Sequence, residues 1–288
     1  MHADSRGSAA GYAAEPTDMA RLQEAIHGAD FDYDAGSPHL SHPQLRSAIL
    51  GEIRALVAAQ FKASGRCRVL EVGAGHGAFT DHVLAMGAEV TVTEMSRPSL
   101  DMLQSRYAHN SQAVLLFDPD GQQAFAREDR FDLVLCVSVL HHIPDYETFV
   151  HRVTGLIEEG GAFASFQDPS WYPRRSPGSV RLDRLMYLAW RISKGQNVGR
   201  GIATQLRRFR GVLDESNPSD MVEYHLMRNG VDEQALVGVL EPRFDDVRLW
   251  EYFSTQGRWM QQLGARVRSP QTFGIIATRR RSGGADGP

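Results

Sequence analysis

The feature that most constrains this chain is a short apolar run that breaks into a glycine-rich loop. The run and the loop read Val69-Leu-Glu-Val-Gly-Ala-Gly-His-Gly-Ala-Phe-Thr80. A buried strand that turns through glycines into a helix is typical of the first unit of an open α/β sheet. Gly73, Gly75 and Gly77 let the backbone approach a ligand where a Cβ atom would clash. The loop therefore predicts a ligand site at the end of a buried strand.

Strand-like and helix-like patterns alternate after this point. Short apolar runs predict strands at 67–72, 89–93, 112–117, 132–137, 161–167, 245–252 and 271–278. Helical spacing predicts helices near 17–29, 43–61, 77–86, 97–107, 146–158 and 231–240. The alternation predicts a doubly wound, Rossmann-like α/β sheet that binds ligands outside the carboxyl ends of its strands.

One long segment interrupts this rhythm and divides the chain. Residues 169–230 carry a helical apolar stripe and a polar, Arg-rich stretch, and an insertion of this kind is usually a lid over a site. The expected segments are a disordered N-terminus at 1–15, N-terminal helices at 16–62, a core at 63–168 and 231–280, a helical lid at 169–230, and a disordered tail at 281–288.

Composition excludes several classes of function. The net charge of −4 gives no general attraction to nucleic acid or to anionic membranes, so neither is an expected partner. The sequence has no signal-peptide h-region and no apolar run of the ~18 residues that a membrane helix needs, which predicts a cytoplasmic protein. Cys67 and Cys136 lie in apolar runs and are expected to be buried in a reducing compartment. No metal-ligand pattern is visible, so no metal is expected.

Acidic residues stand at the ends of the first three predicted strands. Glu71 would repel a phosphate next to the glycine loop and suits a cationic amino-acid sulfonium better. Glu94 can accept hydrogen bonds from both hydroxyls of a ribose, with Met95 beside an adenine. Asp118 can accept from an adenine amino group, or it can be a turn residue within Asp118-Pro-Asp-Gly121.

Two further motifs make a family resemblance specific. Phe131-Asp-Leu-Val134 leads into Leu140-His-His-Ile-Pro-Asp145, and Leu156-Ile-Glu-Glu-Gly-Gly161 precedes the fifth strand. Together with Glu71, the glycine loop and Glu94, these segments resemble the class I S-adenosylmethionine-dependent methyltransferases, most of all the branch that methylates small molecules. The resemblance covers about residues 65–168 and the closing strands.

The resemblance implies S-adenosyl-L-methionine as cofactor, S-adenosyl-L-homocysteine as product, and a seven-stranded sheet with an antiparallel last strand. It implies contacts to the donor from Glu71, Gly73, Ala74, Gly75, Gly77, Glu94, Met95, Asp118, Cys136 and Val137. Glu71 and the glycines would lie around the methionine part, and the backbone near Cys136 would approach the donor's amino group.

Methyl transfer to a hydroxyl calls for a base, and a histidine pair stands where one is needed. His141 is the favoured candidate, with His142 or neither residue as alternatives. The resemblance to some sugar and natural-product O-methyltransferases suggests that this histidine pairs with an acid at the end of the fifth strand. That acid falls at Gln167 in the regular register, so Asp168 fits only with a one-residue shift.

The sequence indicates the residues of the acceptor pocket less clearly than those of the donor site. Residues that could line the pocket are Tyr33, His39, Gln167, Trp171, Tyr172, Tyr224, His225 and Arg228. The expected activity is O-methylation of a secondary metabolite, glycoside or lipid-like alcohol. Alternatives are N- or C-methylation, a non-methylating enzyme, or a non-catalytic binding module. A nicotinamide-dependent oxidoreductase also fits the glycine spacing up to Ala78. The oligomeric state is left open.

Overall fold

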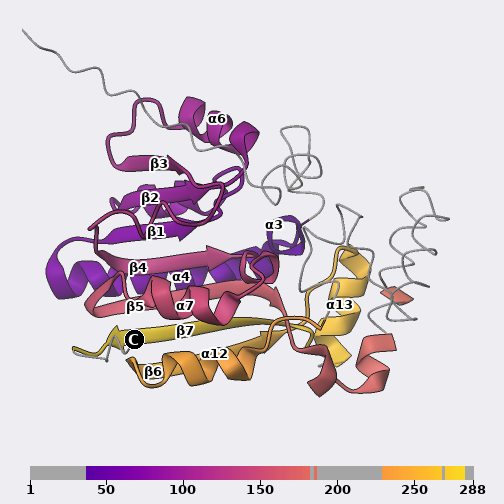
Figure 1. Ribbon diagram of the computed structural model, residues 1–288. Coiled ribbons are helices and arrows are strands. Elements are labelled where there is room, and N and C mark those ends of the chain that lie inside the picture. The colour runs from indigo at the N-terminus through magenta and orange to yellow at the C-terminus, as the bar shows by residue number, and fades with distance from the viewer. Residues whose placement is uncertain (1–36, 182–184, 187–228, 268–269, 283–288) are drawn as a thin grey trace, which may run out of the picture.

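The computed structural model describes residues 37–181, 185–186, 229–267 and 270–282, and its centre is one seven-stranded sheet (Figure 1). The strand order is β3-β2-β1-β4-β5-β7-β6. The strands are β1 (Arg68–Val72), β2 (Glu89–Glu94), β3 (Ala113–Phe117), β4 (Phe131–Val137), β5 (Ile157–Pro169), β6 (Phe244–Tyr252) and β7 (Thr272–Arg280). All seven predicted strands are therefore present.

The direction of the strands follows the prediction. β1 to β5 pair in parallel, whereas β7 is inserted between β5 and β6 and runs antiparallel to both. The sheet is thus mostly parallel with an antiparallel last strand. Because parallel strands all end at the same edge, the segments that follow β1, β2, β3, β4 and β5 meet at one side of the molecule.

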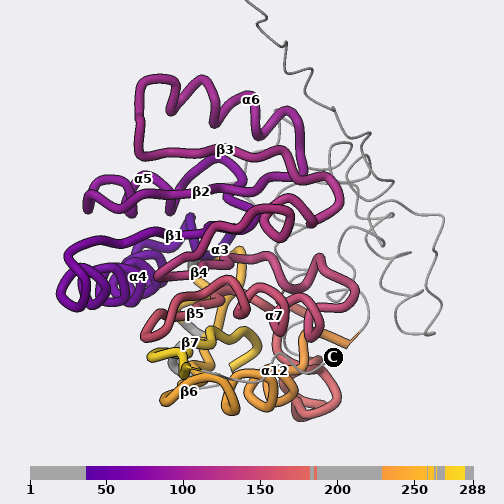
Figure 2. The backbone as a smooth tube through the Cα atoms, turned by 60° about the vertical axis from the view of Figure 1, so that its left-hand side comes forward, coloured from indigo at the N-terminus to yellow at the C-terminus, as the bar shows by residue number. Residues whose placement is uncertain are grey.

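Helices cover both faces of the sheet (Figure 2). The helices of the described residues are α3 (Pro38–Ser41), α4 (Pro43–Ser64), α5 (Thr80–Leu84), α6 (Arg97–Arg106), α7 (Tyr146–Thr154), α12 (Glu233–Leu240) and α13 (Arg258–Val267), with short 3-10 turns at Leu140–His142 and Tyr172–Arg174. One apolar cluster joins α4 and α5 to one face, and a second joins α7 and α12 to the other.

The α4 helix illustrates how sequence produces this packing. Leu45, Ile49 and Ile53 recur at helical spacing and are buried against the sheet. The helix ends at Gly65, whose φ of 75° is a left-handed conformation that glycine adopts without strain.

Some element boundaries differ from the predicted ones. The helix after the glycine loop begins only at Thr80, because residues 75–79 form turns instead. The helix expected to reach residue 158 ends at Thr154, and β5 begins at Ile157. The Gly-Gly turn at 160–161 is thus a kink within the strand, where Gly160 has a φ of 77° and the β4–β5 register shifts.

The two ends of the 169–230 segment lie side by side. Ser170 and Val231 form a β-bridge, and the Val231 N–H donates to the Pro169 carbonyl at 2.8 Å. A Cβ atom on Gly230 would lie 2.3 Å from the Ser170 carbonyl oxygen, so this close approach requires glycine. The segment leaves and rejoins the core at one point. Most of it, like the predicted helix at 17–29, lies outside the described residues.

Arg281, which follows β7, is bound to the core. Arg281 donates its backbone N–H to the Arg243 carbonyl at 2.8 Å, and its guanidinium pairs with Asp245 at 2.9 Å.

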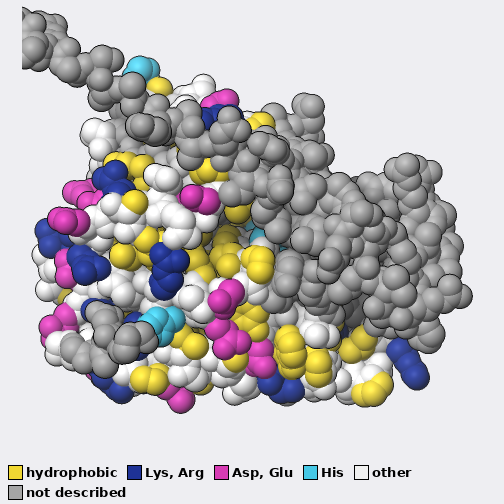
Figure 3. All heavy atoms as spheres, viewed as in Figure 1, with side chains coloured by type: hydrophobic (Ala, Val, Ile, Leu, Met, Phe, Trp, Pro, Cys, Tyr) yellow, Lys and Arg dark blue, Asp and Glu magenta, His cyan; other side chains and the backbone are white. Residues whose placement is uncertain are grey.

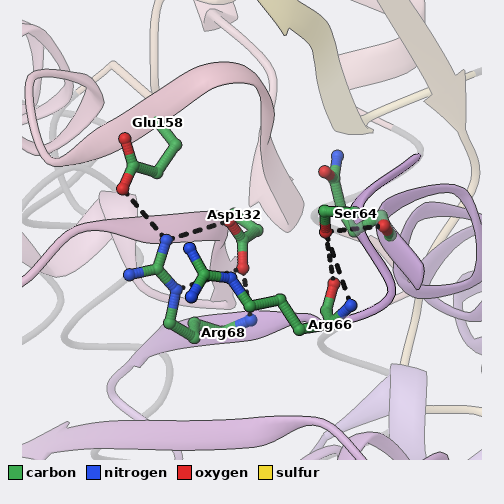
Figure 4. A network of polar contacts seen from close by, with 6 residues as sticks. Ser64, Arg66, Arg68, Asp132 and Glu158 are labelled. Carbon is green, nitrogen blue, oxygen red and sulfur yellow. Dashed lines mark hydrogen bonds and ion pairs between the residues drawn. The ribbon is translucent and has the colours of Figure 1, made fainter. Parts of the chain in front are cut away.

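A polar network closes the amino-terminal edge of the sheet, opposite the glycine loop (Figure 4). The Arg68 backbone N–H donates to Asp132 Oδ2 at 2.7 Å, and its Nη2 donates to Asp132 Oδ1 at 3.1 Å and to Glu158 Oε1 at 3.0 Å. One arginine therefore ties the starts of β1, β4 and β5 together.

On the surface seen in Figure 3, charges of both signs are interspersed, and hydrophobic side chains gather toward the middle of the face. Within the described residues, no helix combines the length and apolarity that crossing a bilayer requires.

Candidate active site at the carboxyl ends of the strands

The glycine loop after β1 adopts a conformation that needs its glycines. Gly73, Gly75 and Gly77 have φ values of 67°, 55° and 81°. A Cβ atom would lie 2.9 Å from Val139 Cγ2 if placed on Gly73, and 2.5 Å from the Tyr107 hydroxyl if placed on Gly77. Side chains of Val139 and Tyr107 therefore pack closely against the loop at Gly73 and Gly77, and the loop can offer its backbone to a ligand.

Two buried carboxyl groups flank this loop. Glu71 accepts a hydrogen bond from the Thr80 hydroxyl at 2.7 Å. Glu94 accepts from the backbone N–H of Gly75 and from that of Ser96, each at 2.9 Å. Burial raises the pKa of each glutamate to about 7. The described partners of both carboxyls are thus a hydroxyl and backbone N–H groups.

A ligand that suits these carboxyls carries positive charge or hydroxyl donors. A cation next to Glu71 would favour its ionised form, whereas a pyrophosphate would add repulsion to a site that already disfavours negative charge. Glu94 still has free acceptor capacity on each oxygen, since a carboxylate accepts about four hydrogen bonds.

The remaining donor-site candidates lie around the same loop. Asp118 directly follows β3 and is buried. Its Oδ1 accepts the Gln123 N–H at 3.0 Å, so it does make a turn contact, and burial raises its pKa. Met95 is half-buried after β2, Ala74 packs against the core, and Cys136 and Val137 are buried at the end of β4.

A histidine and an acid meet across the ends of β4 and β5. His141 Nδ1 lies 2.9 Å from Asp168 Oδ1, and the His141 backbone N–H donates to the same oxygen at 3.1 Å. The Ser165 hydroxyl donates to the other oxygen, Oδ2, at 2.8 Å. Asp168 is fully buried, and each of these neighbours can donate a hydrogen bond to a carboxylate.

The one-residue shift that this pairing requires is a β-bulge in β5. The pairing of β5 with β7 shifts register between Phe166 and Asp168, and Gln167 has a φ of 71°. Ala164 and Phe166 pack with α4, so regular alternation would place Asp168 on that face too. The extra residue instead brings Asp168 to the face of Ser165 and His141.

Other histidines surround the pair. The ring of His142 lies 4.0 Å from that of His141. His39, on α3, stacks on Phe79 at 5.9 Å, and its Nδ1 has no hydrogen-bond partner among the described residues. Burial, together with His141, lowers the pKa of His39 to about 3.

The expected acceptor-site residues are only partly described. Gln167 donates from its side chain to Ser254 Oγ at 2.6 Å. The backbone N–H of Trp171 donates to Glu233 Oε2 at 2.9 Å, and that of Tyr172 to the Asn229 carbonyl at 2.7 Å. Both aromatic residues thus stand where the 169–230 segment leaves the core. Tyr33, Tyr224, His225 and Arg228 lie outside the described residues.

Sequence reasoning missed several supporting residues. The hydroxyls of Ser165 and Thr80 donate hydrogen bonds to the carboxyls of Asp168 and Glu71 respectively, and Tyr252 binds the bulge of β5 with its hydroxyl. Thr80 and Ser165 stand within nine residues of the carboxyls they bind, a spacing that could have suggested them. Tyr252 is 85 residues from its partner and carries no local signal. In the described part of the chain, no three His, Cys, Asp or Glu residues are grouped to hold a metal ion.

Comparison with protein families gives one match over this region. Residues 70–163 match the family described as "Methyltransferase domain". They span β1 to β5 and contain the glycine loop, Glu94 and the histidine pair.

Curated relatives match at moderate identity. A ubiquinone biosynthesis O-methyltransferase of Alkalilimnicola ehrlichii is 33% identical over 95 residues, which is 33% of this chain and 38% of that protein. The enzyme of the same name from Paracidovorax citrulli is 29% identical over 149 residues, 51% of this chain and 59% of that protein. This chain therefore aligns with less than two thirds of the length of these relatives.

Solved structures share the fold. The N-methyltransferase NodS from Bradyrhizobium japonicum, in complex with S-adenosyl-L-homocysteine, matches with a TM-score of 0.51 at 13% identity, covering 92% of this chain and all of that one. The N-terminal domain of EvdMO1 with the same compound bound matches with a TM-score of 0.52 at 15% identity, covering 91% and 95%.

Proposed function

We propose that this chain, whose residues 70–163 match a methyltransferase domain family, is a class I S-adenosylmethionine-dependent methyltransferase that methylates a hydroxyl group of a small molecule. The observation that carries the proposal is the hydrogen-bonded pair of His141 and Asp168 at the carboxyl edge of the sheet, beside the glycine loop. A base matters more for an alcohol than for an amine, because the alcohol must lose its proton as it reacts.

The donor fits the chemistry of the loop. S-adenosylmethionine, when bound, supplies a methyl group that its positively charged sulfur has already activated. Glu71 would attract the positive charge of the methionine part, since the partner of its buried carboxyl among the described residues is the uncharged Thr80 hydroxyl. Glu94 would accept the ribose hydroxyls, and its bonds to Gly75 and Ser96 fix the direction of its oxygens. The positive-φ glycines leave room for the donor against the backbone.

His141 would remove the proton from the acceptor hydroxyl. A carboxylate at Asp168 accepts from Nδ1, which assigns the ring proton to that atom and makes Nε2 the basic nitrogen that can accept a proton. The same carboxylate stabilises the imidazolium that forms. The contact between His141 and Asp168 is the observation that favours His141 as the base.

The acceptor class rests on the relatives and on the inserted segment. The O-methyltransferases of ubiquinone biosynthesis support oxygen as the methylated atom. NodS, which shares the fold, is an N-methyltransferase, so amine methylation is the second candidate. A secondary metabolite, glycoside or lipid-like alcohol suits the large 169–230 segment, which would supply the pocket wall next to Trp171 and Tyr172.

Two measurements test the proposal. Calorimetric titration should show binding of S-adenosylhomocysteine and no binding of NAD; the reverse result would favour an oxidoreductase, and binding of neither a non-catalytic module. Incubation with methyl-labelled S-adenosylmethionine and a panel of phenols, glycosides, alcohols and amines then identifies the acceptor by its label. Labelling confined to the amines would overturn the hydroxyl assignment.

A further inference from the structure

The hydroxyl of Tyr252 holds the bulge of β5. Tyr252 is the last residue of β6, and its hydroxyl accepts the backbone N–H of Gln167 at 2.8 Å. The same hydroxyl lies 3.4 Å from Oε1 of Gln167, to which it donates. Since β7 separates β6 from β5, the tyrosine reaches across the middle strand to make these contacts.

Gln167 depends on such contacts because of its backbone. Its φ of 71° is a left-handed conformation that residues with side chains rarely adopt. As the extra residue of a bulge, it is left out of the regular ladder of hydrogen bonds. Tyr252 therefore supplies the acceptor that the Gln167 N–H would otherwise lack, and Ser254 holds the side-chain amide at 2.6 Å.

Packing fixes the tyrosine in this position. Its ring lies 4.5 Å from that of Trp250, which in turn packs edge-on against Phe166 at 6.3 Å. Gly274 of β7 pairs with both Trp250 and Phe166, and a Cβ atom there would lie 2.7 Å from Phe166 Cδ1. Burial raises the pKa of Tyr252, so its hydroxyl keeps the proton that it donates.

We propose that Tyr252 is a positioning residue for the His141–Asp168 pair, a role that rests on the proposed function of His141 as base. The bulge turns Gln167 toward Tyr252 and Asp168 toward His141. Without the tyrosine hydroxyl, β5 relaxes toward regular alternation, which moves Asp168 away from Nδ1. Tyr252 acts through the backbone of β5, so it is not itself a catalytic residue.

The surroundings of His141 make this role measurable. In the described part of the chain, the titratable groups found next to it are Asp168 from β5, His142 beside it and His39 from α3. Of these three groups, Asp168 is the one next in sequence to Gln167, the residue that Tyr252 binds. Removing the Tyr252 hydroxyl therefore changes one electrostatic partner of His141 and leaves the two histidines in place.

The test is the pKa of His141 in the full chain, measured by NMR of labelled histidines and assigned by the signal lost in His141→Asn. We expect Tyr252→Phe to lower that pKa by about one unit, because a neighbouring opposite charge shifts a pKa by about one to three units. The matched control is Tyr146→Phe, since the Tyr146 hydroxyl accepts the Asp232 N–H at 2.9 Å in the same kind of bond. That control should leave the His141 titration unchanged.

Two results would overturn the proposal: a folded Tyr252→Phe protein whose His141 titrates as in the wild type, or an equal shift in Tyr146→Phe. If Tyr252→Phe does not fold, Ser254→Ala decides, because it loosens Gln167 from its side-chain end; we expect a smaller shift in the same direction, and no shift would overturn the proposal. Calorimetry with S-adenosylhomocysteine distinguishes failure of the proposed function from failure of the proposed role of Tyr252. Failure of the wild type to bind removes the proposed function, whereas intact binding with an unchanged titration removes only the role of Tyr252.

Discussion

One oxygen of Asp168 contacts both the ring and the backbone of His141: it lies 2.9 Å from Nδ1 and 3.1 Å from the backbone nitrogen. Such double contact fixes both the rotation of the ring and the position of the turn that carries it. The Ser165 hydroxyl holds the opposite oxygen, so the carboxylate cannot rotate without breaking a buried hydrogen bond.

The first prediction concerns the acid of this pair. Asp168→Asn should lower kcat for hydroxyl methylation by about 10²-fold or more, because the amide cannot stabilise a positively charged imidazole. S-adenosylhomocysteine affinity should stay close to that of the wild type, since Asp168 contacts none of the glycine-loop residues in its described hydrogen bonds. Steady-state kinetics with the acceptor from the panel, together with calorimetry, give both values.

The control for this substitution makes the same chemical change four residues beyond His141. Asp145→Asn keeps the N-cap of α7, where Asp145 accepts the Thr148 N–H at 3.1 Å, because asparagine caps helices as well as aspartate does. A similar loss of kcat in both variants would contradict the role of Asp168.

The second prediction decides between the two histidines. His141→Asn should lower kcat by about 10²-fold or more, whereas His142→Asn should reduce it by less than tenfold, because Asp168 pairs with His141 alone in the described contacts. The two rings lie 4.0 Å apart, so each variant is a steric control for the other. A larger effect at His142 would reverse the assignment.

Much of this arrangement could be predicted from the sequence, since the signals were local. Buried strands show as short apolar runs, and Glu71, the glycine loop and Glu94 lie within 24 residues of one another. The sequence predicts too early a start for the helix after the loop, because Gly75-His-Gly-Ala78 carries no pattern that separates turns from a first helical turn.

The His141–Asp168 pair could not be derived from local sequence patterns alone. Strict alternation along β5 places Gln167 on the face of His141, and only a bulge exchanges it with Asp168. That bulge is held by Tyr252, which belongs to a strand 85 residues away. A contact of that range leaves no periodicity in the sequence, so a one-residue register could not be derived without the fold.

The third prediction concerns donor binding. Glu94→Gln should weaken S-adenosylhomocysteine binding by about 10- to 100-fold, because it removes charge-assisted hydrogen bonds worth roughly 1.5–3 kcal/mol. The amide nitrogen also cannot accept one of the two N–H groups, from Gly75 or Ser96, that Glu94 now holds. Glu89→Gln, at the exposed start of the same strand, should bind as the wild type does. Equal dissociation constants in calorimetry for the two variants would exclude Glu94 from the donor site.

The fourth prediction separates stability from binding. Arg68→Met should lower the free energy of unfolding by about 1–3 kcal/mol, because it leaves the buried Asp132 carboxylate without its guanidinium partner. Arg127→Met removes an ion pair whose members are both 44% exposed, and it should cost about 0–1 kcal/mol. Urea denaturation measures both. Binding of S-adenosylhomocysteine should be unchanged in each, since Arg68 lies at the opposite edge of the sheet; weaker binding in Arg68→Met would show that the two edges are coupled.

The last prediction follows from the buried glutamates. Burial raises the pKa of Glu71 and of Glu94 to about 7, above the ordinary value of 4.5. The native chain therefore keeps protons that the unfolded chain has lost between these values. This contribution to stability is full below about pH 4.5 and is lost as the pH rises through about 7, with a slope of at most about 1.4 kcal/mol per pH unit for each carboxyl. His39, whose pKa is lowered to about 3, acts in the opposite direction as the pH falls below 6.5.

A single substitution tests how much Glu71 contributes to the pH dependence of the free energy of unfolding. Glu71→Gln keeps an acceptor for the Thr80 hydroxyl but does not titrate, so the difference in unfolding free energy between wild type and variant should change with pH between about 5 and 7 and be flat above that range. His39 is present in both proteins, so its contribution cancels, and the change isolates Glu71 together with its interaction with Glu94. Because a cationic donor favours the ionised carboxyl, saturating S-adenosylmethionine should flatten the wild-type curve and release protons on binding near pH 6, which calorimetry in buffers of different ionisation enthalpy detects. A pH-independent difference between the two proteins would mean that Glu71 is ionised in the free protein, and that the site is already prepared for positive charge before the donor arrives.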